Sequence, residues 1–244
     1  MSSEVESTVL DSWSSVWRDV TPWMDAFIHD ASTQFITRCF PDILASEPRA
    51  PVKAGIVNEL AYALVVRAWE TDGHPRDIVD LDSQYPQLVS ESVDRVRVRS
   101  GDGQAELSRD GRNEALKIAM RLHWMLRARV LTGSDQQAIA RFRYRIAGSG
   151  FIGPLEADML VGGLLIEIKA GQRSVQSRDM RQLLLYAAML SEGGHDLDSL
   201  CWVNPRRGEV LRLSTEEISS RVSGCAWYEL RGRIVSAFGL ALSK

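Results

Sequence analysis

Hydrophobic positions in the first part of the chain recur every three to four residues, as they do along helices that bury one face. This spacing occurs over residues 3–20, 21–40 and 51–69. Residues 71–110 are polar and rich in Asp, Gly and Arg, and we expect one helix there, over 90–101. No repeat period relates these segments to one another. Residues 1–110 are therefore predicted to form a helical N-terminal region.

The pattern changes after residue 110, where strand-like spacing joins the helical spacing. Residues 111–131 have a helical pattern, and the imperfect alternation over 137–148 predicts a strand. Two more strands flank Gly162 and Gly163, a pair that suits a two-residue hairpin turn because both positions tolerate positive φ. A helix, a second hairpin and one or two closing helices follow over 177–194, 199–214 and 215–242. This order predicts an α/β fold with a mixed central sheet in residues 111–244.

The amino-acid composition and the absence of targeting segments indicate where in the cell the protein is expected. The 244 residues are 45% hydrophobic and 25% charged, which is ordinary for a globular protein. Three scattered cysteines, Cys39, Cys201 and Cys225, form no C-x-x-C pair for a zinc or iron–sulfur site and fit a reducing compartment. The N-terminus lacks the features of a signal peptide, and no apolar run reaches the roughly 18–20 residues of a membrane helix. We therefore expect a cytoplasmic protein without a membrane partner.

Charge is distributed unevenly between lysine and arginine. The net charge of −3 argues against a broad electropositive surface for nucleic acid. Local basic clusters remain over 141–145, 172–181 and 204–208. Arginine supplies most basic residues, because lysine occurs only at Lys53, Lys117, Lys169 and Lys244. A lysine inside an apolar strand, such as Lys169, is therefore informative.

The hairpin around Gly162 and Gly163 carries charges on one face. If these glycines form the turn, Asp158 lies directly opposite Glu167, and Glu156 lies opposite Lys169. Side chains alternate between the faces of a strand, so these four residues share one face. The other face has an apolar set for packing, formed by Met159, Val161, Leu164, Ile166 and Ile168.

Two directly opposed carboxylates destabilise a hairpin unless positive charge lies between them. Lys169 supplies part of that charge, and a divalent cation would supply more, since Mg²⁺ prefers carboxylate oxygens together with water and phosphate. The competing interpretation is a solvent-exposed hairpin with an ion pair between Glu156 and Lys169. The next helix adds Gln182 and Tyr186, which lie four residues apart and so on one helical face.

The motif D-(x)n-E-x-K on a strand pair, followed by Q-x-x-x-Y on the next helix, resembles the PD-(D/E)XK nuclease superfamily, and its RecB-like branch in particular. The resemblance covers residues 111–205. It implies a restriction-endonuclease-like αβββαβ core, which agrees with the predicted order of elements. It also implies metal-dependent hydrolysis of phosphodiester bonds in DNA, with RNA as the other candidate substrate, in defence, repair or recombination.

The resemblance implies a role for each motif residue. Asp158 and Glu167 correspond to the acids that bind Mg²⁺ or Mn²⁺. Lys169 corresponds to the lysine that orients the attacking water and steadies charge on the phosphate. Gln182 and Tyr186 correspond to the pair that supports the site and contacts the nucleic-acid strand.

The chain also departs from the family pattern. Pro154 precedes Asp158 by four positions, whereas the family has proline and aspartate side by side. The branch often has a further acid or histidine before the first core strand. We expect Glu114 to complete the metal site, because its helix directly precedes that strand, with Glu59 as the alternative. His123 is interpreted as a core or edge histidine.

Two further features concern partners. No G-x-x-x-x-G-K-[ST] motif is present, so any ATP-driven motor would be another protein. A second hypothesis keeps the fold without the chemistry: a catalytically silent binding or scaffold module in a nucleic-acid-processing complex. The acidic net charge favours that hypothesis, or a protein partner that supplies basic surface. The intact acid–acid–lysine set favours the enzyme.

Overall fold

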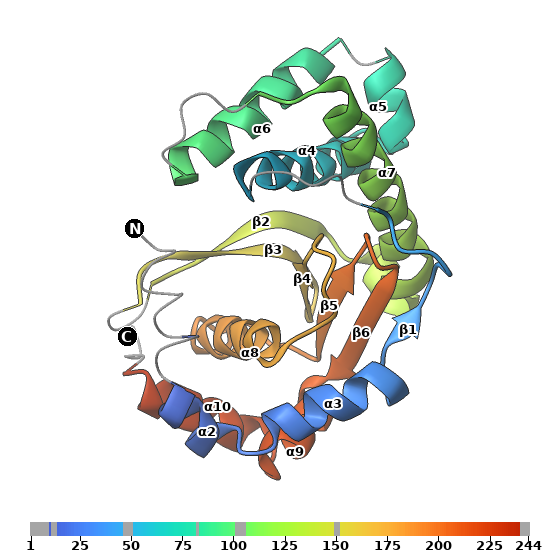
Figure 1. Ribbon diagram of the computed structural model, residues 1–244. Helices are drawn as coiled ribbons and strands as arrows, with labels where there is room; N and C mark the ends of the chain where they lie inside the picture. Colours follow the sequence, from blue (N-terminus) through green and yellow to red (C-terminus); the bar gives the residue numbers. More distant parts are fainter. Residues whose placement is uncertain are drawn as a thin grey trace.

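The computed structural model describes Leu10 and residues 14–45, 51–81, 83–100, 106–148 and 152–239. This part of the chain forms an α/β fold around one six-stranded mixed sheet (Figure 1). The strands are β1 (Thr37–Arg38), β2 (Ala140–Ile146), β3 (Leu155–Val161), β4 (Leu164–Ile168), β5 (Ser199–Asn204) and β6 (Glu209–Ser214). Their spatial order is β1-β6-β5-β4-β3-β2. Only β4 and β5 run parallel among these neighbours, so the predicted mixed sheet is confirmed.

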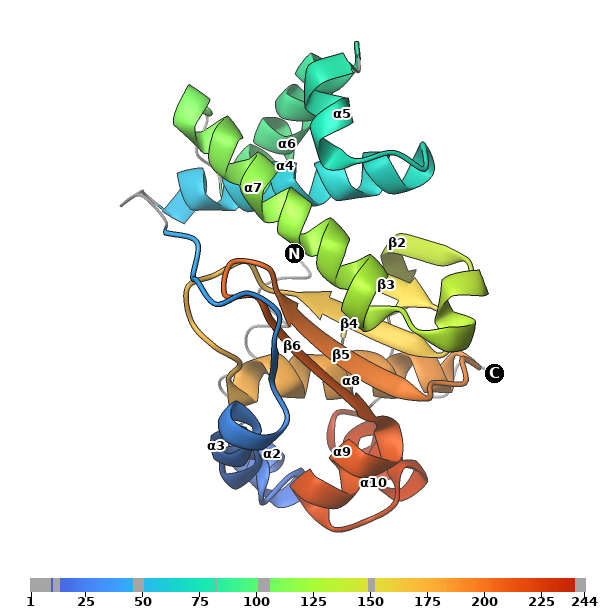
Figure 2. The same ribbon diagram turned by 90° about the vertical axis from the view of Figure 1, so that its right-hand side faces the viewer.

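Helices form a layer on each side of the sheet (Figures 1 and 2). One layer consists of α4 (Pro51–Glu70), α5 (Pro75–Leu81), α6 (Tyr85–Ser100) and α7 (Arg109–Met125). The other consists of α2 (Ser14–Val20), α3 (Met24–Gln34), α8 (Ser177–Glu192), α9 (Thr215–Ser223) and α10 (Trp227–Ala237). Each layer closes its own hydrophobic core against the sheet, as expected for alternating apolar strands.

The predicted element order after residue 110 is confirmed. Helix α7 covers most of the segment 111–131 and continues into a π-helical turn at Leu126–Val130. Strands β2, β3 and β4 follow, then α8, then the β5–β6 hairpin. Two closing helices, α9 and α10, end the described chain. None of the described helices combines the length and hydropathy needed to cross a lipid bilayer.

The N-terminal segment differs from the prediction in two places. Residues 71–110 contain two helices, α5 and α6, where one was expected. Helix α5 has only seven residues, too few for a clear period, and it is anchored by the buried side chain of Ile78. The expected helix over 21–40 is wrong at its end: α3 stops at Gln34, and strand β1 follows and pairs with β6 at the sheet edge.

Residues before 110 pack on both sides of the sheet. Trp17 and Phe27, from α2 and α3, lie in the same core as α8, α9 and α10. Leu60 and Leu64, from α4, lie in the core beside α7. The boundary at residue 110 stays a prediction. Residues 3–9 and 11–13 of the expected helix 3–20 lie outside the described residues.

The β3–β4 hairpin has the predicted register next to its turn, but the predicted Asp158–Glu167 and Glu156–Lys169 pairs lie beyond the end of the observed ladder. Val161 pairs with Leu164 and Met159 pairs with Ile166 across a turn in which Gly162 has φ of 54°. The apolar face expected for this hairpin packs in the core beneath α4 and α7. The ladder ends at the Met159–Ile166 pair, and beyond it the two strands diverge (Figure 1).

Candidate functional site

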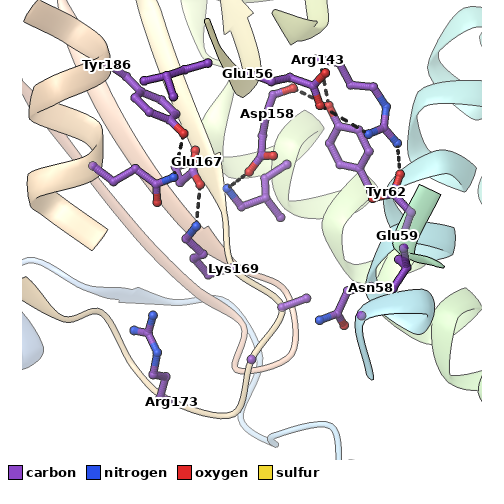
Figure 3. A pocket seen from close by; sticks show the side chains of 17 residues that line it. Asn58, Glu59, Tyr62, Arg143, Glu156, Asp158, Glu167, Lys169, Arg173 and Tyr186 are labelled. Carbon is purple, nitrogen blue, oxygen red and sulfur yellow. Dashed lines mark hydrogen bonds and ion pairs between the residues drawn. The ribbon is translucent and has the colours of Figure 1, made fainter. Parts of the chain in front are cut away.

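A cavity of about 610 Å³ lies where β3 and β4 diverge. Helices α4 and α6 form one wall, α8 forms the opposite wall, and the strands with the loop after β4 form the floor. The side chains that the sequence motif singles out all line this cavity (Figure 3): Asp158, Glu167, Lys169, Gln182 and Tyr186. The fold thus brings together residues from two strands and one helix.

Glu167 and Lys169 form an ion pair on the β4 side of the cavity. Glu167 is 4% exposed, and its Oε1 atom lies 2.6 Å from Lys169 Nζ. The Lys169 backbone is fixed by a 2.9 Å hydrogen bond from its N–H to the Val203 carbonyl of β5. Burial disfavours the ammonium, but the Glu167 and Asp158 carboxylates outweigh burial and raise the pKa of Lys169. Lys169 is therefore charged at neutral pH.

Asp158 bridges the gap between the diverging strands. Its Oδ2 atom accepts a 2.6 Å hydrogen bond from the Ile168 backbone N–H, so the carboxylate replaces the next bond of the β3–β4 ladder. Desolvation raises the pKa of the Asp158 carboxyl, although Lys169 and the Ile168 N–H act in the opposite direction. A further positive charge would therefore stabilise the ionised carboxylate.

The ion pair of the exposed-hairpin interpretation is replaced by another arrangement. Lys169 binds Glu167, while Glu156 lies 3.7 Å from the guanidinium of Arg143. Opposite them on α8, Gln182 Nε2 donates a 2.9 Å hydrogen bond to the hydroxyl of Tyr186, as their four-residue spacing allows. Tyr186 is 2% exposed, so the ring is fixed by the core while its hydroxyl borders the cavity.

Of the two candidates for a third acid, Glu59 lines the cavity and Glu114 does not. Glu114 is 11% exposed and lies 2.8 Å from the guanidinium of Arg206, which reaches α7 from the β5–β6 turn. Glu59 Oε1 lies 2.5 Å from Arg143 and 3.2 Å from Arg95. The preference for Glu114 rested on chain order, and chain order could not reveal its buried arginine partner.

Sequence analysis gave no site role to several residues that line the cavity, among them Tyr62, Arg143 and Arg173. Arg143 and Arg173 belong to the basic clusters 141–145 and 172–181, so the signal was present but not specific. Tyr62 contacts the Asp158 backbone across 96 residues, a separation that no local pattern predicts. His123, by contrast, is 8% exposed and packs edge-on against Trp69, as expected for a core histidine.

The donor set suits a hard cation that is bound together with water and substrate. Among the described residues, no three His, Cys, Asp or Glu side chains are gathered so as to hold a metal ion. Asp158 and Glu167 nevertheless offer two carboxylates, and Mg²⁺ commonly takes one or two carboxylates with waters and substrate phosphates. The cavity lining has four carboxylates and three cationic side chains, so an added cation is electrostatically acceptable.

Comparisons of the chain with protein-family models, with curated proteins and with solved structures find no match. Residue chemistry in the cavity is therefore the basis for inferring function. That chemistry consists of paired acids, a charged lysine and a Gln–Tyr pair.

Proposed function

We propose that the protein is a metal-dependent nuclease that hydrolyses phosphodiester bonds in DNA, on a restriction-endonuclease-like core. One observation carries the proposal: Asp158, Glu167 and Lys169 line a single cavity at the point where two strands diverge. Paired carboxylates beside a lysine suit a substrate that is anionic and needs both a metal ion and a fixed positive charge. RNA is the alternative substrate.

Asp158 and Glu167 would hold the Mg²⁺ or Mn²⁺ ion. When bound, such an ion lowers the pKa of its water and neutralises charge on the phosphoryl group. Lys169 would orient the attacking water and stabilise negative charge on the phosphate oxygens. The 2.6 Å contact with Glu167 fixes the position of its ammonium for this role.

Gln182 and Tyr186 would support the nucleic-acid strand on the α8 side. Their mutual hydrogen bond and the burial of the Tyr186 ring fix the hydroxyl at the cavity border. Arg173 lines the same cavity and would add positive charge near the strand. Its guanidinium is oriented by two hydrogen bonds of 2.5 and 2.7 Å to the carboxylate of Asp179.

The setting we propose is cytoplasmic defence, repair or recombination. Cys39, Cys201 and Cys225 are free thiols, which suits a reducing compartment. The net charge of −3 favours a protein partner that supplies basic surface, and such a partner would also supply any motor activity.

Cleavage assays test the proposal directly. Linear DNA, circular DNA and RNA are incubated with wild-type protein in Mg²⁺, Mn²⁺ or EDTA. We expect metal-dependent cleavage that falls about 100- to 1,000-fold in Asp158→Ala, the range found when one transition-state contact is removed. Asp196→Ala, which changes an exposed acid in the loop before β5, is the matched control and should cleave normally.

Equal cleavage by wild type and Asp158→Ala would refute the site. No cleavage of any substrate under any metal condition would favour the alternative, a nuclease-fold binding or scaffold module.

A further inference from the structure

Strands β2 and β3 form a two-stranded ribbon, the β2–β3 ribbon, whose side chains exchange faces at Asp158. Phe142 pairs with Met159 and Tyr144 pairs with Ala157, in one continuous register. Residues two apart on a strand normally share a face. Met159 nevertheless packs in the core beneath α4 and α7, whereas Ala157 packs in the core beside α8.

The partner strand turns over at the same level. Phe142 packs on the α4 side and Tyr144 on the α8 side. Arg143, between them, has φ of 51°, a left-handed conformation that is uncommon for a residue other than glycine. Arg143 and Asp158 are thus the one position in this register where the regular pairing is interrupted.

The hydroxyl of Tyr62, from α4, occupies this interruption. It donates a hydrogen bond to the Asp158 carbonyl and accepts one of 3.2 Å from the Arg143 backbone N–H. In a regular antiparallel ladder, opposed residues exchange such bonds directly. The Tyr62 hydroxyl therefore stands between a donor and an acceptor that would otherwise meet.

The Tyr62 side chain is well fixed for this task. It is 8% exposed, the guanidinium of Arg143 lies 4.6 Å from its ring centroid, and the ring of Phe142 packs edge-on at 6.2 Å. Glu59, one turn before Tyr62 in α4, forms a 2.5 Å ion pair with Arg143. Helix α4 thus contacts the β2–β3 ribbon at Arg143 and Asp158, where the inversion occurs (Figure 3).

The inversion determines where the Asp158 carboxylate goes. A side chain at the point of inversion belongs to neither face, so it extends sideways toward β4. There its Oδ2 atom accepts the Ile168 N–H at 2.6 Å, beside the Glu167–Lys169 pair. A regular ladder would instead direct this carboxylate to one face of the sheet.

We infer that Tyr62 is a positioning residue: its hydroxyl, inserted between Arg143 N–H and Asp158 C=O, opens the β2–β3 ladder and directs the Asp158 carboxylate into the cavity. Tyr62 acts through Asp158 and has no contact with substrate in this role. The consequence for metal binding and cleavage rests on the proposed function. The consequence for the Asp158–Ile168 hydrogen bond does not.

The test compares Tyr62→Phe with Tyr144→Phe. Tyr144 lies on β2 next to Arg143, and its hydroxyl forms a 2.9 Å hydrogen bond with His195 Nε2, so the control also loses one partly buried hydroxyl contact. Hydrogen exchange of the Ile168 amide is followed by NMR, and Mn²⁺ affinity by calorimetry. In Tyr62→Phe we expect the Ile168 amide to exchange at least tenfold faster and Mn²⁺ to bind about 10- to 100-fold more weakly, the usual effect of losing an outer-shell partner. Tyr144→Phe should match wild type in both.

An Ile168 amide as protected in Tyr62→Phe as in wild type, with unchanged Mn²⁺ affinity, would overturn the inference. A second variant, Asp158→Ala, asks which residue causes the inversion. If Tyr62 does, the Arg143 amide stays protected by the Tyr62 hydroxyl when the carboxylate is gone. Loss of Arg143 protection in Asp158→Ala would show that the carboxylate causes the inversion, and would equally overturn the inference.

Cleavage kinetics provide a third test of the role of Tyr62. A displacement of Asp158 by about 1 Å should lower kcat about 100-fold and leave KM for DNA nearly unchanged. If wild type cleaves nothing, the proposed function fails while the Ile168 and Arg143 amides still decide the role of Tyr62. If wild type cleaves and Tyr62→Phe cleaves equally well, the positioning role fails while the proposed function stands.

Discussion

At the scale of single residues, Asp158 lies in surroundings that disfavour its own charge. Desolvation raises the pKa of its carboxyl despite the nearby Lys169. A raised folded-state pKa means that the ionised form costs stability above that pKa. The position is therefore better suited to holding a cation than to stabilising the fold.

We accordingly predict that Asp158→Asn stabilises the protein at pH 7 without divalent cations. The amide oxygen can still accept the Ile168 N–H, while the unfavourable charge is removed. Urea unfolding measures the difference. Asp179→Asn is the contrasting variant: it removes the charge and replaces one of the two oxygens that accept hydrogen bonds from Arg173 by an NH2 donor, and should destabilise by about 1.5–3 kcal/mol. A loss of stability in Asp158→Asn would contradict the prediction.

Some of the site residues could be predicted because local rules place them. The Gly162–Gly163 turn fixes the register as far as Met159–Ile166, and strand alternation places Glu167 and Lys169 on one face. Asp158 was expected on that face by the same rule, but it reaches the cavity from the point of inversion. Tyr62 could not be predicted this way, since its role depends on how α4 packs over the β2–β3 ribbon. Glu114 was preferred by chain order, but the tertiary structure pairs it with Arg206.

At the scale of elements, the β5–β6 turn holds the loop that follows Lys169. Arg206 Nε donates a 2.9 Å hydrogen bond to the Ala170 carbonyl, and Asn204 Nδ2 donates one of 2.9 Å to the Gly171 carbonyl. Arg206 also joins this turn to α7 through Glu114, with a side chain that is only 4% exposed. The loop that follows β4 and Lys169 is therefore linked to the β5–β6 turn and, through that turn, to α7.

Because this ion pair is buried, we predict that Arg206→Leu costs about 3–5 kcal/mol, mostly because the guanidinium beside the buried Glu114 carboxylate is lost. The double variant Arg206→Leu, Glu114→Leu should recover a large part of that loss. Chemical denaturation of the two single variants and the double variant gives the coupling energy. Arg233→Ala, which breaks an exposed pair with Glu229 on α10, should cost less than about 0.5 kcal/mol. Additive losses in the double variant would contradict this assignment.

Long, periodic elements were predictable and short ones were not. Helices α7 and α8 and the two hairpins follow patterns that extend over many residues. Helix α5 and strand β1 have seven and two residues, and they depend on tertiary partners: the core around Ile78 and the edge of β6. The inversion at Arg143 could not be predicted from the sequence either, because arginine rarely adopts positive φ.

At the scale of the whole molecule, two helical layers share one sheet (Figure 1), and residues of both layers line the cavity. Stability of the α4–α7 layer therefore affects the site wall that carries Tyr62 and Glu59. His123, on α7, contacts Trp69 of α4 and His74 before α5. It thus joins α7 to α4 and to the segment that leads into α5.

Burial, Arg127 and His74 lower the pKa of His123 from 6.5 to about 4, against a weaker opposite effect of Asp72. The unfolded chain therefore takes up a proton first as the pH falls. We predict that stability decreases between about pH 6.5 and pH 4 by about 1–2 kcal/mol and then levels off for this group. Thermal unfolding across this range, compared with His123→Gln, isolates the contribution. An identical pH profile in the variant would contradict it.

The most direct measurement of the proposed chemistry is the single-turnover cleavage rate of DNA in Mg²⁺ by Lys169→Met and Lys117→Met. Lys169 lines the cavity, whereas Lys117 is an exposed lysine on α7, so both variants lose one ammonium of the same kind. We predict that Lys169→Met cleaves about 100- to 1,000-fold more slowly than wild type and that Lys117→Met cleaves at the wild-type rate. Equal rates for the two variants would contradict the assignment of Asp158, Glu167 and Lys169 as a nuclease site.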